Sequence, residues 1–145
     1  MTPQFYVTVG ETAEFAKTLT ESDLAMFCAI SGDFDPIHVD EERASRTIFG
    51  RRVAHGILSM ALLSTVSAMI SKRAVERGSP GISVSMGYDR IRFLKPVFIG
   101  DTLTARYTIQ DIDPVKSRSR SKVEVRNQHD ELVVVGEHLM KWLSP

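Results

Sequence analysis

Asp33 and His38 are the two side chains whose types and spacing best suit acid–base chemistry, and they lie five positions apart in the segment SGDFDPIH, residues 31–38. Imidazole titrates near neutral pH, and a carboxylate can orient it or exchange protons with it. In a helix or a strand this spacing would point the two side chains in different directions. Gly32 is suited to end a helix, and Pro36 delays the start of the next one. We therefore expect irregular backbone from Asp33 to His38, on which both functional groups can converge.

The same segment also has an ordinary structural interpretation. Asp33 can stabilise a turn after Gly32, and His38 can be the neighbour of a helix that begins near Asp40. The spacing alone favours this interpretation, so the rest of the sequence must decide. Asp35 adds a second carboxylate, which either raises the proton affinity of the first or points to solvent.

A second candidate for chemistry is the dipeptide His55-Gly56, which stands at the start of a long apolar run. The first N–H groups of a helix have no partner within it, and they lie at the positive end of its dipole. Because Gly56 has no side chain to block approach, this position can polarise a carbonyl group and stabilise negative charge on its oxygen. The alternative is that Gly56 only permits close packing of the helix on a sheet.

The residues before Ser83 follow mainly helical patterns. Thr20 is a suitable N-cap, with acidic residues in the turn after it. The segment after Gly56 is apolar nearly all round, which is typical of a helix surrounded by protein. The elements expected here are a strand over 15–19, a helix from Thr20 to Ser31, a short helix over 41–45 and a long helix from about 54 to 76.

From Ser83 onward the pattern changes to the alternation of strands. The run at 103–110 alternates apolar with polar residues, the run at 116–126 has one charged face, and the run at 132–142 is more fully apolar. We expect these three strands to form an antiparallel meander with the strand before them. In that preceding strand the parity of the apolar residues changes near Asp89, which predicts a β-bulge.

A sheet with one charged face and a helix apolar nearly all round predict an α+β fold, a curved antiparallel sheet wrapped around a long central helix. The 145 residues, 43% of them hydrophobic, fit a single domain over 1–145. Such a sheet leaves a free edge strand, which favours the pairing of two copies.

The composition excludes several classes of partner. Lys and Arg number 18, as do Asp and Glu, so no overall charge favours nucleic acid or a membrane surface. The longest apolar stretch, Ile57–Ile70, is too short to span a bilayer. The first residues lack the pattern of a secretory signal, and the lone Cys28 lies in an apolar stretch typical of a buried thiol. We therefore expect a cytoplasmic protein.

Three ordered motifs carry a resemblance to a known family: SGDFDPIH at 31–38, VAHGIL at 53–58 and RFLKPVFIGDT at 92–102. With them the chain resembles the MaoC-like (R)-specific enoyl-CoA hydratases and dehydratases of the hot-dog fold, over most of its length. The resemblance implies reversible addition of water to a trans-2-enoyl thioester. It also implies an acyl-CoA or acyl carrier protein thioester as partner, no cofactor, and a homodimer or larger homo-oligomer.

Carried over to this chain, the resemblance implies that Asp33 and His38 hold one water and handle its proton and the α-carbon proton. The Gly56 N–H would donate to the thioester carbonyl. Ser64 would lie near the acyl pocket, with a serine bonded back to its own helix as the alternative. Asp35 departs from the family pattern, in which asparagine is more common, and this departure puts the pH behaviour in doubt.

The other polar groups suggest less specific roles. His129, in a predicted turn, and His138, in a strand, are interpreted as structural. No His, Cys and carboxylate residues have the spacing of a metal site, so no metal is expected. Contacts to coenzyme A phosphates would come from a basic strand face, for which simple solvation is the alternative, or from arginines nearer residues 31–38. These candidates are Lys116, Arg118, Arg120, Lys122 and Arg126 on the strand, and Arg46, Arg51 and Arg52 near the loop.

Two other functions use the same fold. A hot-dog thioesterase commonly places a carboxylate on the central helix, and Ile57–Ile70 contains none. A non-catalytic acyl-CoA-binding domain would not need Asp33, His38 and Gly56 together. The sequence leaves open the acyl chain length and the physiological direction of the reaction.

Overall fold

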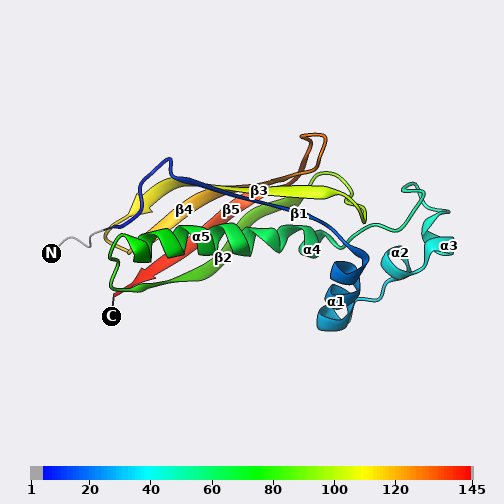
Figure 1. Cartoon of the computed structure of the whole chain (residues 1–145), viewed down its shortest axis with the longest axis horizontal. Coiled ribbons are helices and arrows are strands. Elements are labelled where there is room, and N and C mark those ends of the chain that lie inside the picture. Colours follow the sequence, from blue (N-terminus) through cyan, green and yellow to red (C-terminus); the bar gives the residue numbers. More distant parts are fainter. Residues whose placement is uncertain (1–4, 145) are drawn as a thin grey trace.

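The computed structural model describes residues 5–144. They include one curved sheet of five antiparallel strands. The strands lie in the order β1-β3-β4-β5-β2, and the sheet curves around the long helix α5 (Figure 1). Their bounds are Thr12–Thr18 for β1, Ile82–Phe93 for β2, Thr102–Asp113 for β3, Arg118–Arg126 for β4 and Leu132–Leu143 for β5. The predicted α+β fold, a sheet wrapped around a helix, is confirmed.

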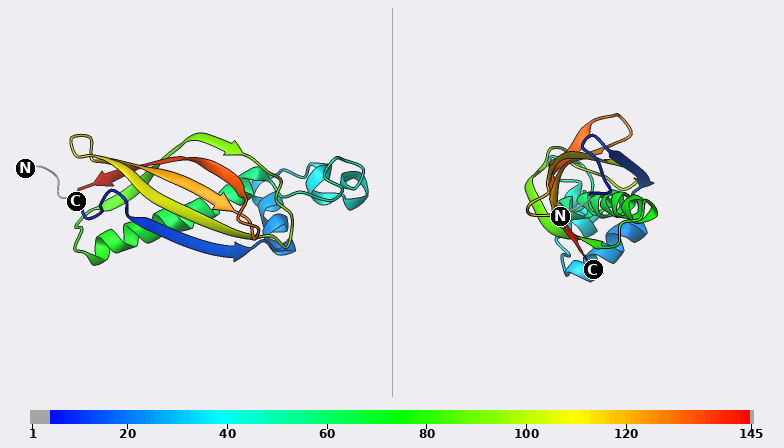
Figure 2. Two further views of the ribbon diagram at one scale, coloured as in Figure 1. Left: turned by 90° about the horizontal axis from the view of Figure 1, so that it is seen from above. Right: turned by 90° about the vertical axis from the view of Figure 1, so that its left-hand side faces the viewer.

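The helices fall into two groups. α4 and α5 follow one another along the concave side of the sheet, whereas α1, α2 and α3 lie towards one end of it (Figures 1 and 2). Their bounds are Glu21–Ser31 for α1, Pro36–Val39 for α2, Glu41–Ala44 for α3, Gly56–Met60 for α4 and Leu62–Glu76 for α5. The two segments that carry the candidate catalytic residues, 31–38 and 55–56, therefore meet at the same end of the sheet.

The core forms where alternate strand residues point at α5. The inward positions of two strands are almost completely buried: Leu103, Ala105, Tyr107 and Ile109 on β3, and Ser119, Ser121, Val123 and Val125 on β4. Leu63, Val66 and Ile70 on α5 are fully buried against them. Removing this apolar surface from water supplies the main stabilisation of the fold, since each fully buried side chain of this kind contributes about 1.5–3 kcal/mol.

One face of α5 remains open in the single chain. Ser64, Thr65, Ala68 and Val75 on this face are exposed. The sequence predicted a helix surrounded by protein, and the sheet of one chain satisfies this prediction on one side only.

β2 stands at the edge of the sheet, where it pairs with β5. The expected order, with this strand beside β3 in one meander, is wrong, because β1 occupies that place. The predicted bulge is confirmed by a register shift between Asp89 and Arg92, and a second shift lies between Ser85 and Gly87. Gly87 has a φ of 130°, which residues with a side chain rarely adopt.

Three predicted boundaries need correction. β1 begins at Thr12 rather than at residue 15, because Thr12, Ala13 and Glu14 also pair with β3. The long helix is divided at Ala61 into α4 and α5. The irregular backbone expected from Asp33 to His38 ends sooner, because Pro36 starts α2 at the one helical position that suits its fixed φ and missing N–H.

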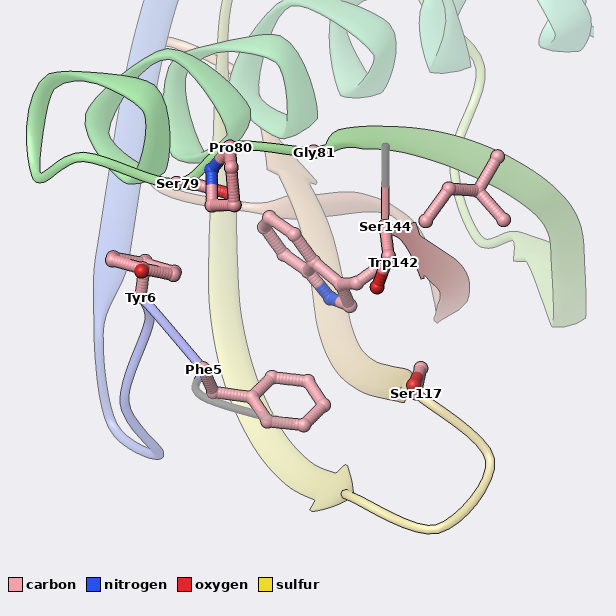
Figure 3. A pocket seen from close by; sticks show the side chains of 9 residues that line it. Phe5, Tyr6, Ser79, Pro80, Gly81, Ser117, Trp142 and Ser144 are labelled. Carbon is pink, nitrogen blue, oxygen red and sulfur yellow. The ribbon is translucent and has the colours of Figure 1, made fainter. Parts of the chain in front are cut away.

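A cavity of about 150 Å³ lies at the other end of the sheet, among the side chains of Phe5, Tyr6 and Trp142 (Figure 3). The Trp142 indole Nε1–H donates to Ser119 Oγ at 2.9 Å, which fixes the ring over the sheet. None of the residues that line this cavity comes from 31–56, so the cavity is separate from the candidate catalytic segments. Of the helices within residues 5–144, none combines the length and the hydropathy needed to cross a bilayer.

Candidate active site

The loop that carries Asp33 begins where α1 ends. Gly32 has a φ of 77°, the left-handed conformation that often terminates a helix, and its N–H donates to the Cys28 carbonyl at 2.8 Å. Ser31 Oγ accepts from the Asp33 N–H at 3.1 Å. Asp33 Oδ1 in turn accepts from the Asp35 N–H at 3.1 Å. One carboxylate oxygen of Asp33 is therefore used to fix the loop, and Oδ2 remains for other contacts.

Asp35, whose role the sequence left open, caps α2. Its Oδ1 accepts from the Ile37 N–H at 3.0 Å, and Pro36 follows it at the first helical position. The second carboxylate is thus committed to the helix start that presents His38. Asparagine has an oxygen at the same place and can make the same cap.

His38 lies opposite Asp33. Its Nδ1 is 2.7 Å from the Val53 carbonyl oxygen. Because a carbonyl oxygen can only accept, Nδ1 carries the proton and Nε2 keeps a free lone pair. Nε2 lies 3.8 Å from Asp33 Oδ2. This distance is too long for a direct hydrogen bond, but a molecule the size of water, lying to one side of the line that joins the two atoms, can contact both.

His55 joins the two groups, and the sequence assigned it no role of its own. Its ring stacks on that of His38, with 3.7 Å between centroids and 27° between planes. His55 Nε2 lies 3.1 Å from the Asp33 carbonyl oxygen and 3.8 Å from Asp33 Oδ2. The only sequence signal was the position of His55 directly before Gly56.

The ligand-type atoms of Asp33, His38 and His55 all lie within 4.8 Å of one another. The search for metal-ligand spacing in the sequence missed this cluster, because folding brings together residues from two separate segments. Chelation needs lone pairs that converge on one point. The rings of the two histidines stack with 27° between their planes, and the proton on His55 Nε2 is donated to a carbonyl oxygen. The arrangement suits proton transfer better than metal binding.

Gly56 begins α4 beside this cluster. A Cβ atom at this position would lie 2.9 Å from the Phe93 ring, so the helix and β2 approach as closely as the packing interpretation requires. No acceptor among residues 5–144 takes a hydrogen bond from the Gly56 N–H. A hollow of about 340 Å³ opens here and is lined in part by Gly56, Phe93 and Pro96. Close packing and an open N–H group therefore coexist at Gly56.

Ser64 is not brought to this cluster. It lies eight positions after Gly56, about 12 Å along the helices at 1.5 Å per residue. Its side chain lines a separate hollow of about 400 Å³ between α5 and β2. On α5, the serines that bond back to their own helix are Ser67 and Ser71, at 2.9 and 3.1 Å from carbonyl oxygens one turn earlier. Among the described residues, the Ser64 hydroxyl has no such partner.

Two of the three arginines near the loop already have carboxylate partners. Arg46 pairs with Glu42, and Arg52 binds both oxygens of Glu21 at 2.8 Å. The hydrogen bonds from Arg52 lower the pKa of the Glu21 carboxyl. Arg51 instead lies over the Phe98 ring, 3.8 Å from its centroid. Within residues 5–144, Arg51 is the member of this group that lacks a carboxylate partner.

The basic face of β4 is largely neutralised by its neighbours. Arg120 pairs with Glu137 on β5 at 2.5 Å, and Lys122 pairs with Glu124 at 2.7 Å. Such exposed pairs add little stability, but they compete with a phosphate for the same cations. The contacts favour a solvated strand face over a phosphate site.

The curved antiparallel sheet around a central helix is the hot-dog fold, and comparisons place the chain within it. Residues 5–133 match the profile described as MaoC like domain. The chain belongs to this MaoC-like family.

The similar proteins include named enzymes and a solved structure. The (R)-specific enoyl-CoA hydratase of Rhodospirillum rubrum is 38% identical over 107 residues, which cover 74% of this chain and 69% of that protein. The 3-hydroxybutyryl-CoA dehydratase of Methylorubrum extorquens is 35% identical over 133 residues, 92% of this chain and 79% of that one. The unliganded R-hydratase of Pseudomonas aeruginosa superposes with a TM-score of 0.81 at 34% identity, covering 97% of this chain and 86% of its own.

Proposed function

We propose that this protein is a hydro-lyase, an (R)-specific enoyl-thioester hydratase that also dehydrates 3-hydroxyacyl thioesters in the reverse direction. The observation that carries the proposal is the 3.8 Å gap between Asp33 Oδ2 and His38 Nε2. This gap occurs in a chain that is 35–38% identical to proteins named as hydratase and dehydratase.

In the proposed reaction, Asp33 and His38 hold one water molecule between them. His38 Nε2 has the lone pair that can accept a proton, because Nδ1–H is donated to Val53. The water oxygen adds to C3 of the enoyl group, and the acid–base pair delivers a proton to C2. The water is thus fully incorporated, and the pair returns to its starting protonation.

The thioester carbonyl would accept a hydrogen bond from the Gly56 N–H. Addition at C3 moves negative charge onto this carbonyl oxygen, so a fixed donor stabilises the transition state more than the ground state. The open N–H and the adjoining hollow support this assignment. No cofactor is required, since the thioester itself activates the double bond. Ser64 would contact only the distal part of an acyl chain.

We further propose a cytoplasmic homodimer that forms through β2. This edge strand exposes Ile82, Val84, Met86 and Phe93, and an apolar edge is commonly covered by a partner strand. Pairing two copies at β2 would continue the sheet across the dimer. The acyl group is carried by coenzyme A or by acyl carrier protein.

The test is incubation of the protein with crotonyl-CoA. We expect loss of the conjugated enoyl absorbance and formation of the (R)-3-hydroxyacyl thioester, identified by chiral chromatography. The matched control is the double variant Asp33→Asn, His38→Ala, which should lose this activity. Release of free thiol without loss of the enoyl absorbance would indicate a thioesterase, and binding without turnover would indicate a non-catalytic acyl-CoA-binding domain.

A further inference from the structure

We propose that His55 is a positioning residue of the Asp33–His38 site. Its Nε2–H donates a hydrogen bond to the Asp33 backbone carbonyl and so fixes the position of Asp33 relative to His38. This inference rests on the proposed hydratase function and adds a residue to it.

The His55 side chain lies beneath the reacting groups rather than among them. Only 3% of it is exposed, whereas 13% of His38 and 50% of the Asp33 side chain are accessible. His55 therefore cannot contact a substrate directly. It can act only through the residues that it touches.

The hydrogen bonding of His55 fixes its tautomer. Nε2 lies 3.1 Å from the Asp33 carbonyl oxygen, which can only accept, so Nε2 carries the proton. Nδ1 is buried and has no partner among the described residues. An unpartnered buried nitrogen costs about 1–3 kcal/mol, which an apolar ring at this position would avoid. The imidazole is thus explained by the bond that Nε2–H makes and not by packing.

The contacts of His55 join every part of the site. One side of its ring packs on Phe27 of α1, with 4.6 Å between centroids, and another side stacks on His38 of α2. Its own backbone leads directly into Gly56, and its Nε2–H reaches the Asp33 carbonyl. One residue therefore sets the relative positions of the carboxylate, the imidazole base and the carbonyl-binding N–H.

The Asp33 loop depends on this bond. The other contacts that fix Asp33 come from Ser31 and Asp35, within the loop itself. The bond from His55 attaches the loop to the central helix. A displacement of about 1 Å in a reacting group can cost on the order of 100-fold in rate.

The experiment compares His55→Phe with His55→Gln. Phe keeps an aromatic ring and its stacking but has no N–H, whereas Gln places an amide N–H near the position of Nε2. We expect His55→Phe to lower kcat for crotonyl-CoA about 10- to 100-fold with KM changed less than about 3-fold, and His55→Gln to stay within about 5-fold of the original kcat. Equal losses of kcat in both variants, or an unchanged kcat in His55→Phe, would overturn the proposal. The melting temperatures of both variants should be measured as well. They distinguish a loss of kcat caused by unfolding from one caused by misplaced reacting groups.

A second measurement does not depend on activity. Nitrogen-15 NMR of the imidazole groups should show His55 with its proton on Nε2 and none on Nδ1. A proton on Nδ1 alone would contradict the hydrogen bond, whether or not the protein hydrates crotonyl-CoA. Conversely, if the unaltered protein shows the expected tautomer but no hydration, the proposed function fails while the bond from His55 to Asp33 stands.

Discussion

Two sites that contain histidine differ in how completely the ring nitrogens are hydrogen-bonded. His138 on β5 has a partner at each nitrogen: Ser85 Oγ lies 2.7 Å from Nε2, and Tyr107 Oη lies 2.8 Å from Nδ1. Its ring stacks on Tyr88, with 4.5 Å between centroids. The His138 ring is fully buried, and neither of its nitrogens remains available for a reaction.

The pair His38 and His55 is less complete. Each ring uses one nitrogen to bind a backbone carbonyl, and the second nitrogen of each has no hydrogen-bond partner among residues 5–144. His38 Nε2 faces the accessible carboxylate of Asp33. Buried polar groups are normally hydrogen-bonded, so the buried His55 Nδ1 needs an explanation, whereas the His38 side chain is partly accessible. We therefore expect a structural role for His138 and, in the proposed reaction, a chemical role for His38 and a positioning role for His55.

The largest expected effect comes from removing the acid–base pair. Asp33→Asn and His38→Ala should each lower kcat for crotonyl-CoA by about 10³-fold, since general acid–base groups typically contribute 10²–10⁴-fold. If both act on one water, the double variant should be little worse than either single variant. Steady-state kinetics of all three variants, with circular dichroism to confirm folding, test this. Multiplicative losses in the double variant would show that the residues act independently.

The second effect concerns stability and belongs to His138. Burial lowers the pKa of His138 to about 4 in the folded protein, from 6.5. Between pH 4 and pH 6.5, His138 is therefore protonated in the unfolded chain but neutral in the folded protein. Stability from this group is complete above pH 6.5 and falls as the pH is lowered towards 4, by about 3 kcal/mol in total. Urea unfolding measured from pH 7 to pH 4 should show this loss.

The control for that prediction is His138→Phe, which keeps an aromatic ring beside Tyr88. Removing both hydrogen bonds should cost about 1–3 kcal/mol at pH 7. The part of the pH dependence that comes from His138 should disappear, and hydration of crotonyl-CoA should persist. An unchanged loss of stability between pH 6.5 and 4 in this variant would assign the effect to other groups.

The next effect tests the approach between α4 and β2. Gly56→Ala places a methyl group about where the Phe93 ring now lies, at 2.9 Å. The ring is half exposed and can shift, so we expect only about 1 kcal/mol of destabilisation but about a 10-fold loss of kcat, since reacting groups move with it. The double variant Gly56→Ala, Phe93→Leu should recover part of the loss. No recovery would mean that the methyl group acts on something other than Phe93.

The sequence predicted the parts of the fold that follow from local chemistry. Thr20 caps α1 and Gly32 ends it in the left-handed conformation, as their residue types suggested, and the structure adds a capping box with Asp23. The parity change near Asp89 correctly located a bulge. Each of these features depends on residues close together in the chain, and periodicity or residue type is sufficient to find them.

The features that the sequence did not reveal depend on contacts between distant segments. The place of β2 beside β5 is decided by which strand covers each edge of the sheet, and periodicity carries no such information. The role of His55 required the fold to bring it to Asp33, 22 positions earlier. The motif at 31–38 indicated Asp33 and His38 as an acid–base pair, but His55, which we propose positions them, lies outside this motif.

The smallest expected effect concerns Asp35. Because Asp35 Oδ1 caps α2 through the Ile37 N–H, Asp35→Asn keeps an equivalent oxygen and should change kcat by less than about 3-fold. Asp35→Ala removes the cap, should cost about 1 kcal/mol of stability, and should lower kcat more than Asn does because α2 presents His38. Kinetics and urea unfolding of both variants test this order. If Asp35→Asn instead shifted the pH profile of kcat, Asp35 would act through its charge on the pair His38 and His55, and the division between capping and chemistry within this loop would be wrong.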